Sequence, residues 1–283
     1  MYTTLISPTD LKKHHADPNW AICDCRFDLN NPASGRSEYG LGHIPHAVYV
    51  HLDHDLSTTP NGTNGRHPLP SVEDLIVRIE ALGIDNATQV IVYDDDGGGY
   101  AVRLWWSLRY LGHPAVAVLD GGLQAWIAAG FELSNGDEQR PHRTFRADVQ
   151  VDRLITVDQL IENLYRPEIL LLDSRAPERF KGEVELLDPV AGRIPGAENR
   201  FWRNNLNTQG SFKAASELHA ELEAQLGGRL GADAIVYCGS GVTSCHNIVA
   251  FVHAGFEMPR LYAGAWSEWC SDPSRGVETG ETN

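Results

Sequence analysis

The sequence predicts an α/β protein made of two tandem domains, each with a mostly parallel central sheet and helices on both faces. Short, continuously apolar runs alternate with segments of helical spacing, as expected of parallel strands that are buried on both sides. The same order of segments then occurs a second time. With 283 residues, the chain is long enough for two domains of ordinary size.

The repeat is visible as short motifs that recur in the same order, about 145 residues apart. A polar stretch without hydrophobic periodicity separates the two sets and is typical of a linker. The matching motifs are residues 22–26 and 169–175, 42–47 and 192–197, 91–94 and 235–238, and 121–126 and 264–269. We therefore predict an N-terminal domain over residues 1–131, a linker over 132–153, a C-terminal domain over 154–272 and a tail over 273–283.

Local signals place the elements of each half. Ser7 and Pro8 mark a helix start, and Ser71 and Gly83 bracket a second helix, because serine caps helix starts and glycine follows helix ends. Continuous apolar runs predict strands, and helical spacing follows several of them. The expected strands are residues 20–26, 89–93, 116–119, 169–175 and 234–237, and further helices are expected over 100–111, through Trp126 and from about Val242.

One long irregular stretch, residues 59–70, interrupts this pattern. It contains Asn61-Gly62 and Asn64-Gly65, which are turn signals, and two prolines. Structureless loops of this length are uncommon in compact domains unless they serve a site or are disordered. We therefore examine its polar residues Arg66 and His67 as candidates for a binding site.

The most informative stretch surrounds Cys238. This cysteine follows an apolar strand, and the small-residue loop 239–244 leads from it into the next helix. Backbone N–H groups of such a loop, together with the positive end of a helix dipole, favour thiolate over thiol and hold a bound anion. We interpret Cys238 as a nucleophile and residues 239–244 as its anion cradle. The alternative is an inert, buried cysteine.

The first half carries Asp94 at the position that Cys238 holds in the second half. A carboxylate lacks the nucleophilic sulfur of a cysteine and repels anionic reactants. The repeat therefore predicts that the N-terminal domain is catalytically silent and that the two halves differ at Cys238.

Composition narrows the range of partners. The chain has 38 acidic and 23 basic residues, a formal net charge of −15, and no Lys/Arg-rich run, which argues against nucleic acid or an anionic membrane surface as a partner. No segment reaches the roughly 18 apolar residues that span a bilayer, and the N-terminus has no secretory-signal pattern. The five cysteines show no disulfide spacing, so we expect a cytoplasmic protein with reduced thiols.

Several motifs together resemble the rhodanese family. The loop Cys238-Gly239-Ser240-Gly241-Val242-Thr243 is similar to the active loop of 3-mercaptopyruvate sulfurtransferases, and three supporting motifs are Arg179-Phe180, Ile194-Pro195-Gly196 and Trp266-Ser267-Glu268-Trp269. The resemblance covers nearly the whole chain. It implies two rhodanese-like domains, an inactive first domain, and a Cys238 that carries sulfane sulfur as a persulfide.

The resemblance also implies roles for residues around the cysteine. Gly239, Ser240, Gly241, Val242, Thr243 and Ser244 are expected to form the substrate-binding loop, with helix capping and loop bracing as the expected work of Thr243 and Ser244. Arg179 matches a family arginine that grips a carboxylate, with a structural ion pair as the alternative.

The charge of the residues that follow Cys238 indicates which sulfur donor the protein uses. Relatives that are specialised for thiosulfate place cationic residues directly after the cysteine, whereas Gly239 and Ser240 are neutral, which favours 3-mercaptopyruvate. Two departures leave thiosulfate open as the alternative donor. The segment 182–189 lacks the second substrate arginine of some mercaptopyruvate enzymes, and Arg193 stands where the family usually has histidine.

Four further residues are candidates for the site, each with a structural alternative. Arg193 either replaces the missing positive charge or braces the domain interface. Arg66 and His67 are candidates from the long loop, and His43 is a candidate proton relay to Ser240 or a buried histidine bonded to the backbone.

Other function classes fit the residues less well. Cysteine-dependent phosphatases clamp phosphate with an arginine at the place where Ser244 stands, and the loop holds no arginine. A second domain without its cysteine would favour a non-enzymatic binding module, whereas Cys238 is present here. The spacing of Cys238, Cys245 and His246 is unlike a zinc site, so we expect no metal and no cofactor. The expected partners are a small-molecule sulfur donor and a thiol, cyanide or thioredoxin-like acceptor.

Overall fold

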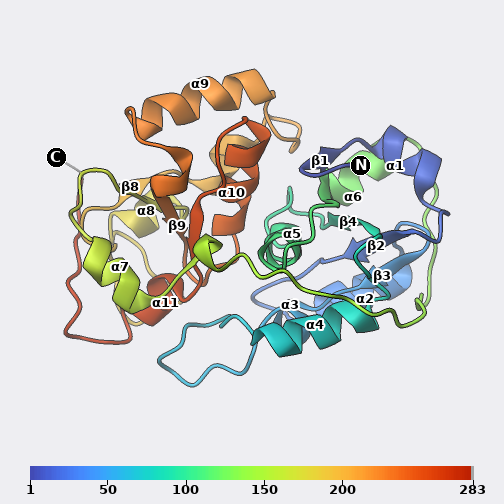
Figure 1. Cartoon of the computed structure of the whole chain (residues 1–283), viewed down its shortest axis with the longest axis horizontal. Helices are drawn as coiled ribbons and strands as arrows, with labels where there is room; N and C mark the ends of the chain where they lie inside the picture. The colour runs from blue at the N-terminus through green and yellow to red at the C-terminus, as the bar shows by residue number, and fades with distance from the viewer. Residues whose placement is uncertain (282–283) are drawn as a thin grey trace. The chain divides into compact units, whose positions relative to one another are not determined.

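The computed structural model describes residues 1–281, which fold into two compact α/β units (Figure 1). Unit 1 consists of Met1–Ser57, Pro70–Gln150 and Thr208–Phe212. Unit 2 consists of Thr58–Leu69, Val151–Asn207 and the chain from Lys213 onward. Each unit has a five-stranded parallel sheet, which confirms the predicted fold class. Within residues 1–281, no helix has the length and apolar character needed to cross a bilayer.

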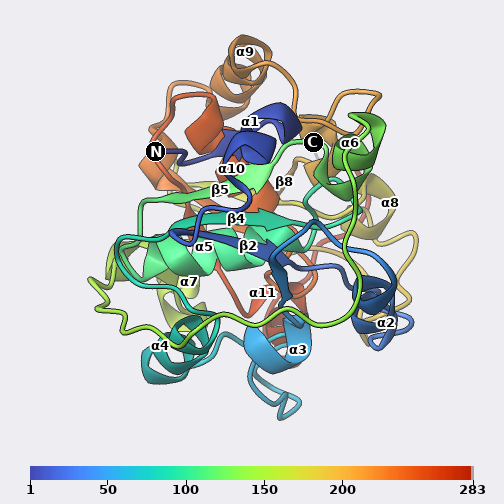
Figure 2. The same cartoon turned by 90° about the vertical axis from the view of Figure 1, so that its right-hand side faces the viewer.

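The sheet of unit 1 has the strand order β1-β5-β4-β2-β3, and every pairing is parallel. Figure 2 shows α1 on one side of β2 and β4, with α3 and α4 on the other. The strands are β1 (Leu5–Ile6), β2 (Trp20–Asp24), β3 (Ala47–Tyr49), β4 (Gln89–Tyr93) and β5 (Val116–Leu119). The helices are α1 (Pro8–His14), α2 (Ser34–Leu41), α3 (Leu52–Asp55), α4 (Val72–Ala81), α5 (Ala101–Tyr110) and α6 (Gly122–Ala128).

The sheet of unit 2 repeats this order as β6-β10-β9-β7-β8, again with parallel pairs only. The strands are β6 (Leu154–Ile155), β7 (Leu170–Asp173), β8 (Glu198–Asn199), β9 (Ala234–Tyr237) and β10 (Arg260–Tyr262). The α-helices are α7 (Val157–Asn163), α8 (Pro177–Phe180), α9 (Ala215–Leu226), α10 (Ser244–His253) and α11 (Ala265–Trp269). Short 3-10 turns, η1 (Val151–Arg153), η2 (Trp202–Asn205) and η3 (Gly231–Asp233), complete the unit.

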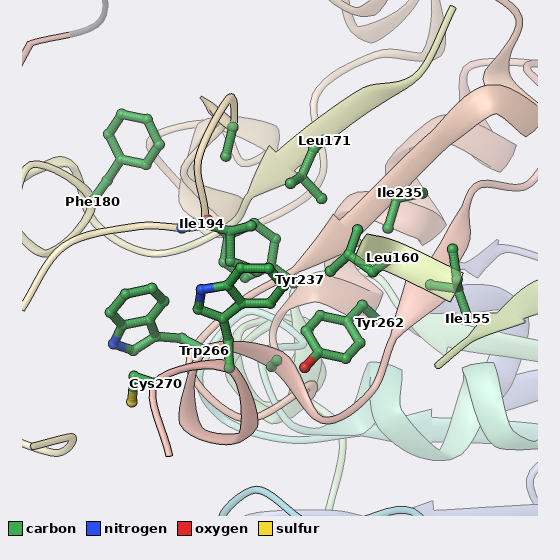
Figure 3. Packing of buried hydrophobic residues seen from close by; sticks show 13 residues of the cluster. Ile155, Leu160, Leu171, Phe180, Ile194, Ile235, Tyr237, Tyr262, Trp266 and Cys270 are labelled. Carbon is green, nitrogen blue, oxygen red and sulfur yellow. The ribbon is translucent and has the colours of Figure 1, made fainter. Parts of the chain in front are cut away.

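The core of unit 2 is built from strand residues and the inner faces of α7 and α11. Leu171 and Ile235 of the sheet, Leu160 of α7 and Trp266 of α11 belong to one buried cluster (Figure 3). Both central strands, β4 and β9, are buried along their whole length, which explains why their sequences are continuously apolar. This core fixes the carboxyl end of β9, where Cys238 follows.

The same buried ion pair stabilises the strand end in each unit. Arg26 donates through Nη2 to Asp24 at 2.6 Å and to the Gly42 carbonyl at 2.7 Å. Arg175 repeats this arrangement, donating to Asp173 at 2.6 Å and to the Gly192 carbonyl at 2.6 Å. Each arginine therefore ties the end of a central strand to the Gly-x-Ile-Pro turn of its repeat.

Two short segments pack with the unit formed mainly by the other half of the chain. Residues 58–69 belong to unit 2, and residues 208–212 belong to unit 1, where the Phe212 N–H donates to Asp120 at 2.8 Å. Most of the expected linker also packs on unit 1. Arg140 donates to the Trp20 carbonyl at 2.7 Å, and Phe145 is buried.

We expect Arg26→Met to lower the free energy of unfolding by about 3–5 kcal/mol, because it leaves the buried Asp24 carboxylate without its counter-charge. The control is Arg36→Met, which removes an exposed ion pair with Asp137 and is expected to cost less than about 1 kcal/mol. Urea unfolding followed by circular dichroism measures both. An equally small loss of unfolding free energy in the two variants would contradict a structural role for the buried pair.

Candidate active site

Cys238 lies directly after β9, in the loop that leads to α10. Its side chain is buried, and α10 begins at Ser244, two residues later than expected. Gly241 has a φ of +77°, and a side chain there would run into the backbone carbonyl of Ala263. Only glycine fits this position without strain, so the small residues of the loop are required by its tight course.

The N-terminus of α11 fixes the orientation of the loop. The Trp266 N–H donates to the Cys238 carbonyl at 3.0 Å, and the Ser267 N–H donates to the Gly239 carbonyl at 2.9 Å. These bonds hold two loop carbonyls on the α11 side. The N–H of Ser240 lies close enough to the cysteine sulfur to lower the pKa of its thiol.

The hydrogen bonds around Cys238 favour the thiolate. Burial raises the pKa of the Cys238 thiol, but the hydroxyls of Thr243 and Ser244 and the N–H groups of Ser240 and Ser244 lower it, and the net pKa lies below the ordinary value of a cysteine. The expected capping role of the Thr243 side chain is wrong. Thr243 stands at the N-cap of α10, but its hydroxyl makes no capping bond; it lowers the pKa of the Cys238 thiol.

The long loop 58–69 delivers a histidine to this site. His67 Nδ1 lies 2.7 Å from Ser240 Oγ, and both side chains are buried. The loop is anchored by a bond from the Arg66 N–H to Ser267 Oγ at 3.0 Å. The prediction that this loop serves a site therefore agrees with where it packs.

His43 does not make the contact with Ser240 that we considered for it. It is fully buried in unit 1, its Nδ1 lies 2.8 Å from the Tyr39 carbonyl, and its ring stacks on the Tyr39 ring at 4.1 Å. His67 takes the place beside Ser240 instead. The contacts of His43 match the alternative given for it, a buried histidine bonded to the backbone.

Two guanidinium groups face the loop at Gly239. A Cβ atom added to Gly239 would lie 2.8 Å from Arg66 Nη2 and 3.4 Å from Arg179 Nη1. The two candidates from separate parts of the sequence, Arg66 and Arg179, therefore meet beside the residue that follows the cysteine. Guanidinium groups placed in this way suit the recognition of a carboxylate.

Both guanidinium groups are also paired with buried acids that the sequence analysis did not single out. Arg179 Nη2 donates to Glu185 at 2.7 and 2.8 Å and lies 3.3 Å from Asp188. Arg66 Nη1 donates to Asp188. The side chains of Glu185 and Asp188 are only 3% and 2% exposed. The signal in the sequence was Glu185 within the otherwise apolar run from Val184 to Leu187, with Asp188 directly after it.

Arg193 has a bracing role. It is buried, donates through Nη1 to the Gly280 carbonyl at 2.7 Å, and lies over the Phe180 ring at 4.5 Å. Its backbone forms a bridge with Glu278. These contacts match the bracing alternative, but the partner is the C-terminal segment of unit 2.

The remaining loop and cysteine residues are accounted for by packing. Val242 is buried, and Cys245 donates to the Gly241 carbonyl at 3.6 Å. Burial raises the pKa of Cys270 to about 11, unlike that of Cys238. Among the residues that the structure describes, no group of three or more His, Cys, Asp and Glu side chains is arranged to hold a metal ion.

The equivalent loop of unit 1 is filled by its own carboxylate. Asp94 is fully buried and accepts hydrogen bonds from the N–H groups of Asp96, Gly98, Tyr100 and Ala101, at 2.8 to 2.9 Å. Burial nevertheless raises the pKa of Asp94 above its ordinary value. A loop at this position of the fold thus gathers N–H donors around one acidic side chain.

Comparisons with known proteins agree with this picture. The model of the rhodanese-like domain matches residues 7–129 and 156–272. A probable 3-mercaptopyruvate sulfurtransferase of Pseudomonas aeruginosa is 44% identical over 279 residues, covering 98% of each chain. A putative thiosulfate sulfurtransferase of Mycobacterium tuberculosis is 39% identical, covering 92% of this chain and 91% of that one.

The fold has a close counterpart among solved structures. A 3-mercaptopyruvate sulfotransferase from Escherichia coli superposes with a TM-score of 0.81 at 30% identity, covering 94% of this chain and 99% of that one. The protein therefore belongs to the rhodanese family, as a member with two tandem rhodanese-like domains.

Proposed function

We propose that the protein is a sulfurtransferase that moves a sulfane sulfur from 3-mercaptopyruvate to a thiol or cyanide acceptor through a persulfide on Cys238. The observation that carries this proposal is the lowered pKa of a cysteine that lies in a loop of N–H and hydroxyl donors. A lowered pKa increases the fraction of nucleophilic thiolate, and the same donors stabilise the negative charge of a persulfide.

The first half-reaction forms the persulfide. The Cys238 thiolate attacks the donor sulfur, an S–S bond forms, and the C–S bond breaks with its electron pair passing to the donor carbon. The resulting pyruvate enolate takes up the proton that the donor thiol releases, and pyruvate leaves. In the second half-reaction the acceptor attacks the outer sulfur, and the Cys238 thiolate returns.

Ser240 and His67 are proposed to move that proton. Their contact at 2.7 Å links a hydroxyl next to the cysteine to an imidazole, the side chain whose charge changes most readily near neutral pH. Arg179 and Arg66 are proposed to bind the donor carboxylate, since both lie against Gly239. Unit 1, with Asp94 in its loop, takes no part in the chemistry.

Thiosulfate is the second candidate donor, because a relative with 39% identity carries the name of a putative thiosulfate sulfurtransferase. The neutral residues Gly239 and Ser240 and the acids paired with the arginines favour a singly charged donor over this dianion. A thioredoxin-like protein is a proposed acceptor alongside small thiols and cyanide.

Replacing Cys238 by Ser is expected to abolish transfer with either donor, because it removes the thiol that carries the sulfur. The measurement is thiocyanate formation from 3-mercaptopyruvate and cyanide, with circular dichroism as the check on folding. Cys270→Ser, which removes a thiol of raised pKa, is the control and is expected to stay active. Turnover by Cys238→Ser above a few per cent of the wild-type rate would refute the assignment.

Thr243→Val should raise the pKa of the Cys238 thiol, because it removes the hydroxyl that lowers this pKa most at constant side-chain volume. The pH dependence of iodoacetamide alkylation measures the thiolate fraction. We expect a midpoint below the ordinary cysteine value in the wild type, a higher midpoint in the variant, and slower alkylation of the variant at pH 7. An unchanged midpoint would show that the hydroxyl does not serve the sulfur.

For donor choice, kcat/KM measured with cyanide is expected to be at least ~10-fold higher for 3-mercaptopyruvate than for thiosulfate. His67→Gln should narrow this difference between the two donors. It is expected to lower kcat with 3-mercaptopyruvate, which brings a thiol proton, by about 100-fold or more, and to affect thiosulfate less, because thiosulfate brings none. A preference of the wild-type protein for thiosulfate would overturn the donor assignment.

A further inference from the structure

Four side chains, one from the long loop 58–69 and three from residues 179–188, form a charged cluster beside the cysteine loop. We call Arg66, Arg179, Glu185 and Asp188 the clamp cluster. Asp188 accepts from Nη1 of Arg66 and lies 3.3 Å from Nη2 of Arg179, so it touches both arginines. Glu185 accepts from Nε and Nη2 of Arg179 at 3.2 and 2.7 Å. Both acids are almost completely buried, whereas Arg66 and Arg179 remain 26% and 21% exposed.

The acids take up only one edge of each guanidinium. Nη2 of Arg66 and Nη1 of Arg179 face Gly239 and have no hydrogen-bond partner within residues 1–281. Nη2 of Arg179 also lies beside Gly239, but it donates to both acids. Asp188 therefore holds the two arginines from behind while their other edges converge on the loop that follows Cys238. This arrangement offers two N–H edges to one incoming anion.

The charge of the surroundings is balanced before any donor arrives. Arg175, buried on its pair with Asp173, also lies 3.4 Å from Glu185. The three arginines 66, 175 and 179 thus face the three acids 173, 185 and 188. With no net charge in reserve, the site gains from the local hydrogen bonds to an anion, but it offers little long-range attraction to a second negative charge.

We infer that Asp188 is a specificity-determining residue, which positions Arg66 and Arg179 for one carboxylate and cancels the charge that would draw in a doubly charged donor. This inference rests on the proposed sulfurtransferase function. Segment 182–189 lacks the second substrate arginine, and Arg66 from the long loop takes over the binding of the donor carboxylate. Asp188 holds Arg66 in place.

The charge argument predicts opposite shifts for two variants. Asp188→Asn removes one negative charge from the clamp cluster, so its net charge rises by one. Both anionic donors are then expected to bind more tightly, and the affinity for thiosulfate, which carries two charges, should rise more. Arg66→Gln removes one positive charge, so both donors are expected to bind more weakly, and the affinity for thiosulfate should fall more. A residue that only braced the fold would weaken both donors by the same factor.

The experiment measures kcat and KM for both donors with cyanide as acceptor, in the wild type, Asp188→Asn and Arg66→Gln. We expect the ratio of kcat/KM for thiosulfate to that for 3-mercaptopyruvate to rise about 10-fold in Asp188→Asn and to fall about 10-fold in Arg66→Gln, mainly through KM. Asp272→Asn, the same change at an acid 43% exposed and outside the clamp cluster, is the control and should leave the ratio unchanged.

A second readout uses anions that do not react. In the Cys238→Ser background, sulfate and pyruvate binding are followed by calorimetry. Asp188→Asn is expected to strengthen sulfate binding more than pyruvate binding, by about 10-fold in the ratio of their dissociation constants. This binding measurement does not depend on enzyme turnover.

The outcomes separate the two proposals. A wild-type protein without activity on either donor would refute the proposed function, whatever the variants do. An active wild type with equal losses for both donors in Asp188→Asn would overturn the inference and leave the function standing. Should Asp188→Asn fail to fold, the opposite shift in Arg66→Gln decides, and an unchanged donor ratio in that variant overturns the inference.

Discussion

The loop that follows the central strand of each unit gathers hydrogen-bond donors around one acidic group, and the rest of the structure positions that loop. In unit 1 the group is the Asp94 carboxylate, which accepts from four backbone N–H groups. In unit 2 it is the Cys238 sulfur, whose pKa is lowered by donors from residues 240, 243 and 244. The same local fold thus surrounds a carboxylate in one unit and a cysteine of lowered pKa in the other.

The sheet explains why the loop is held so firmly. β9 is buried throughout, Tyr237 receives the Ile194 N–H at its hydroxyl, and α11 binds the loop carbonyls of Cys238 and Gly239. Cys238 is therefore fixed by its neighbours on both sides before any donor binds. Preorganised donors of this kind stabilise developing charge without a cost of reorganisation.

The surroundings of Cys238 control how much negative charge the site accepts. Arg66 and Arg179 face Gly239, yet Glu185 and Asp188 hold them from behind and cancel their charge. In the proposed function, a donor is recognised by hydrogen-bond geometry more than by net attraction. In this account, the acids of segment 182–189 are part of donor recognition, although that segment was first noted for lacking an arginine.

Much of this was readable from the sequence, because it rests on local patterns. The apolar strands, the repeat and the Cys238 loop follow from periodicity and small-residue spacing, and they predicted the fold and the nucleophile candidate. The contacts of His67, Arg66 and Asp188 were not readable, since they depend on a loop of the first half packing on unit 2. No local signal distinguishes His43, buried on Tyr39, from His67 beside Ser240.

The most direct test of the central claim is the mass of the protein after exposure to 3-mercaptopyruvate, followed by peptide mapping. The account predicts a gain of one sulfur atom on the peptide that contains Cys238, and its loss when cyanide is added. No gain in mass, or a stable sulfur adduct on Cys245 or Cys270 in place of Cys238, would contradict it.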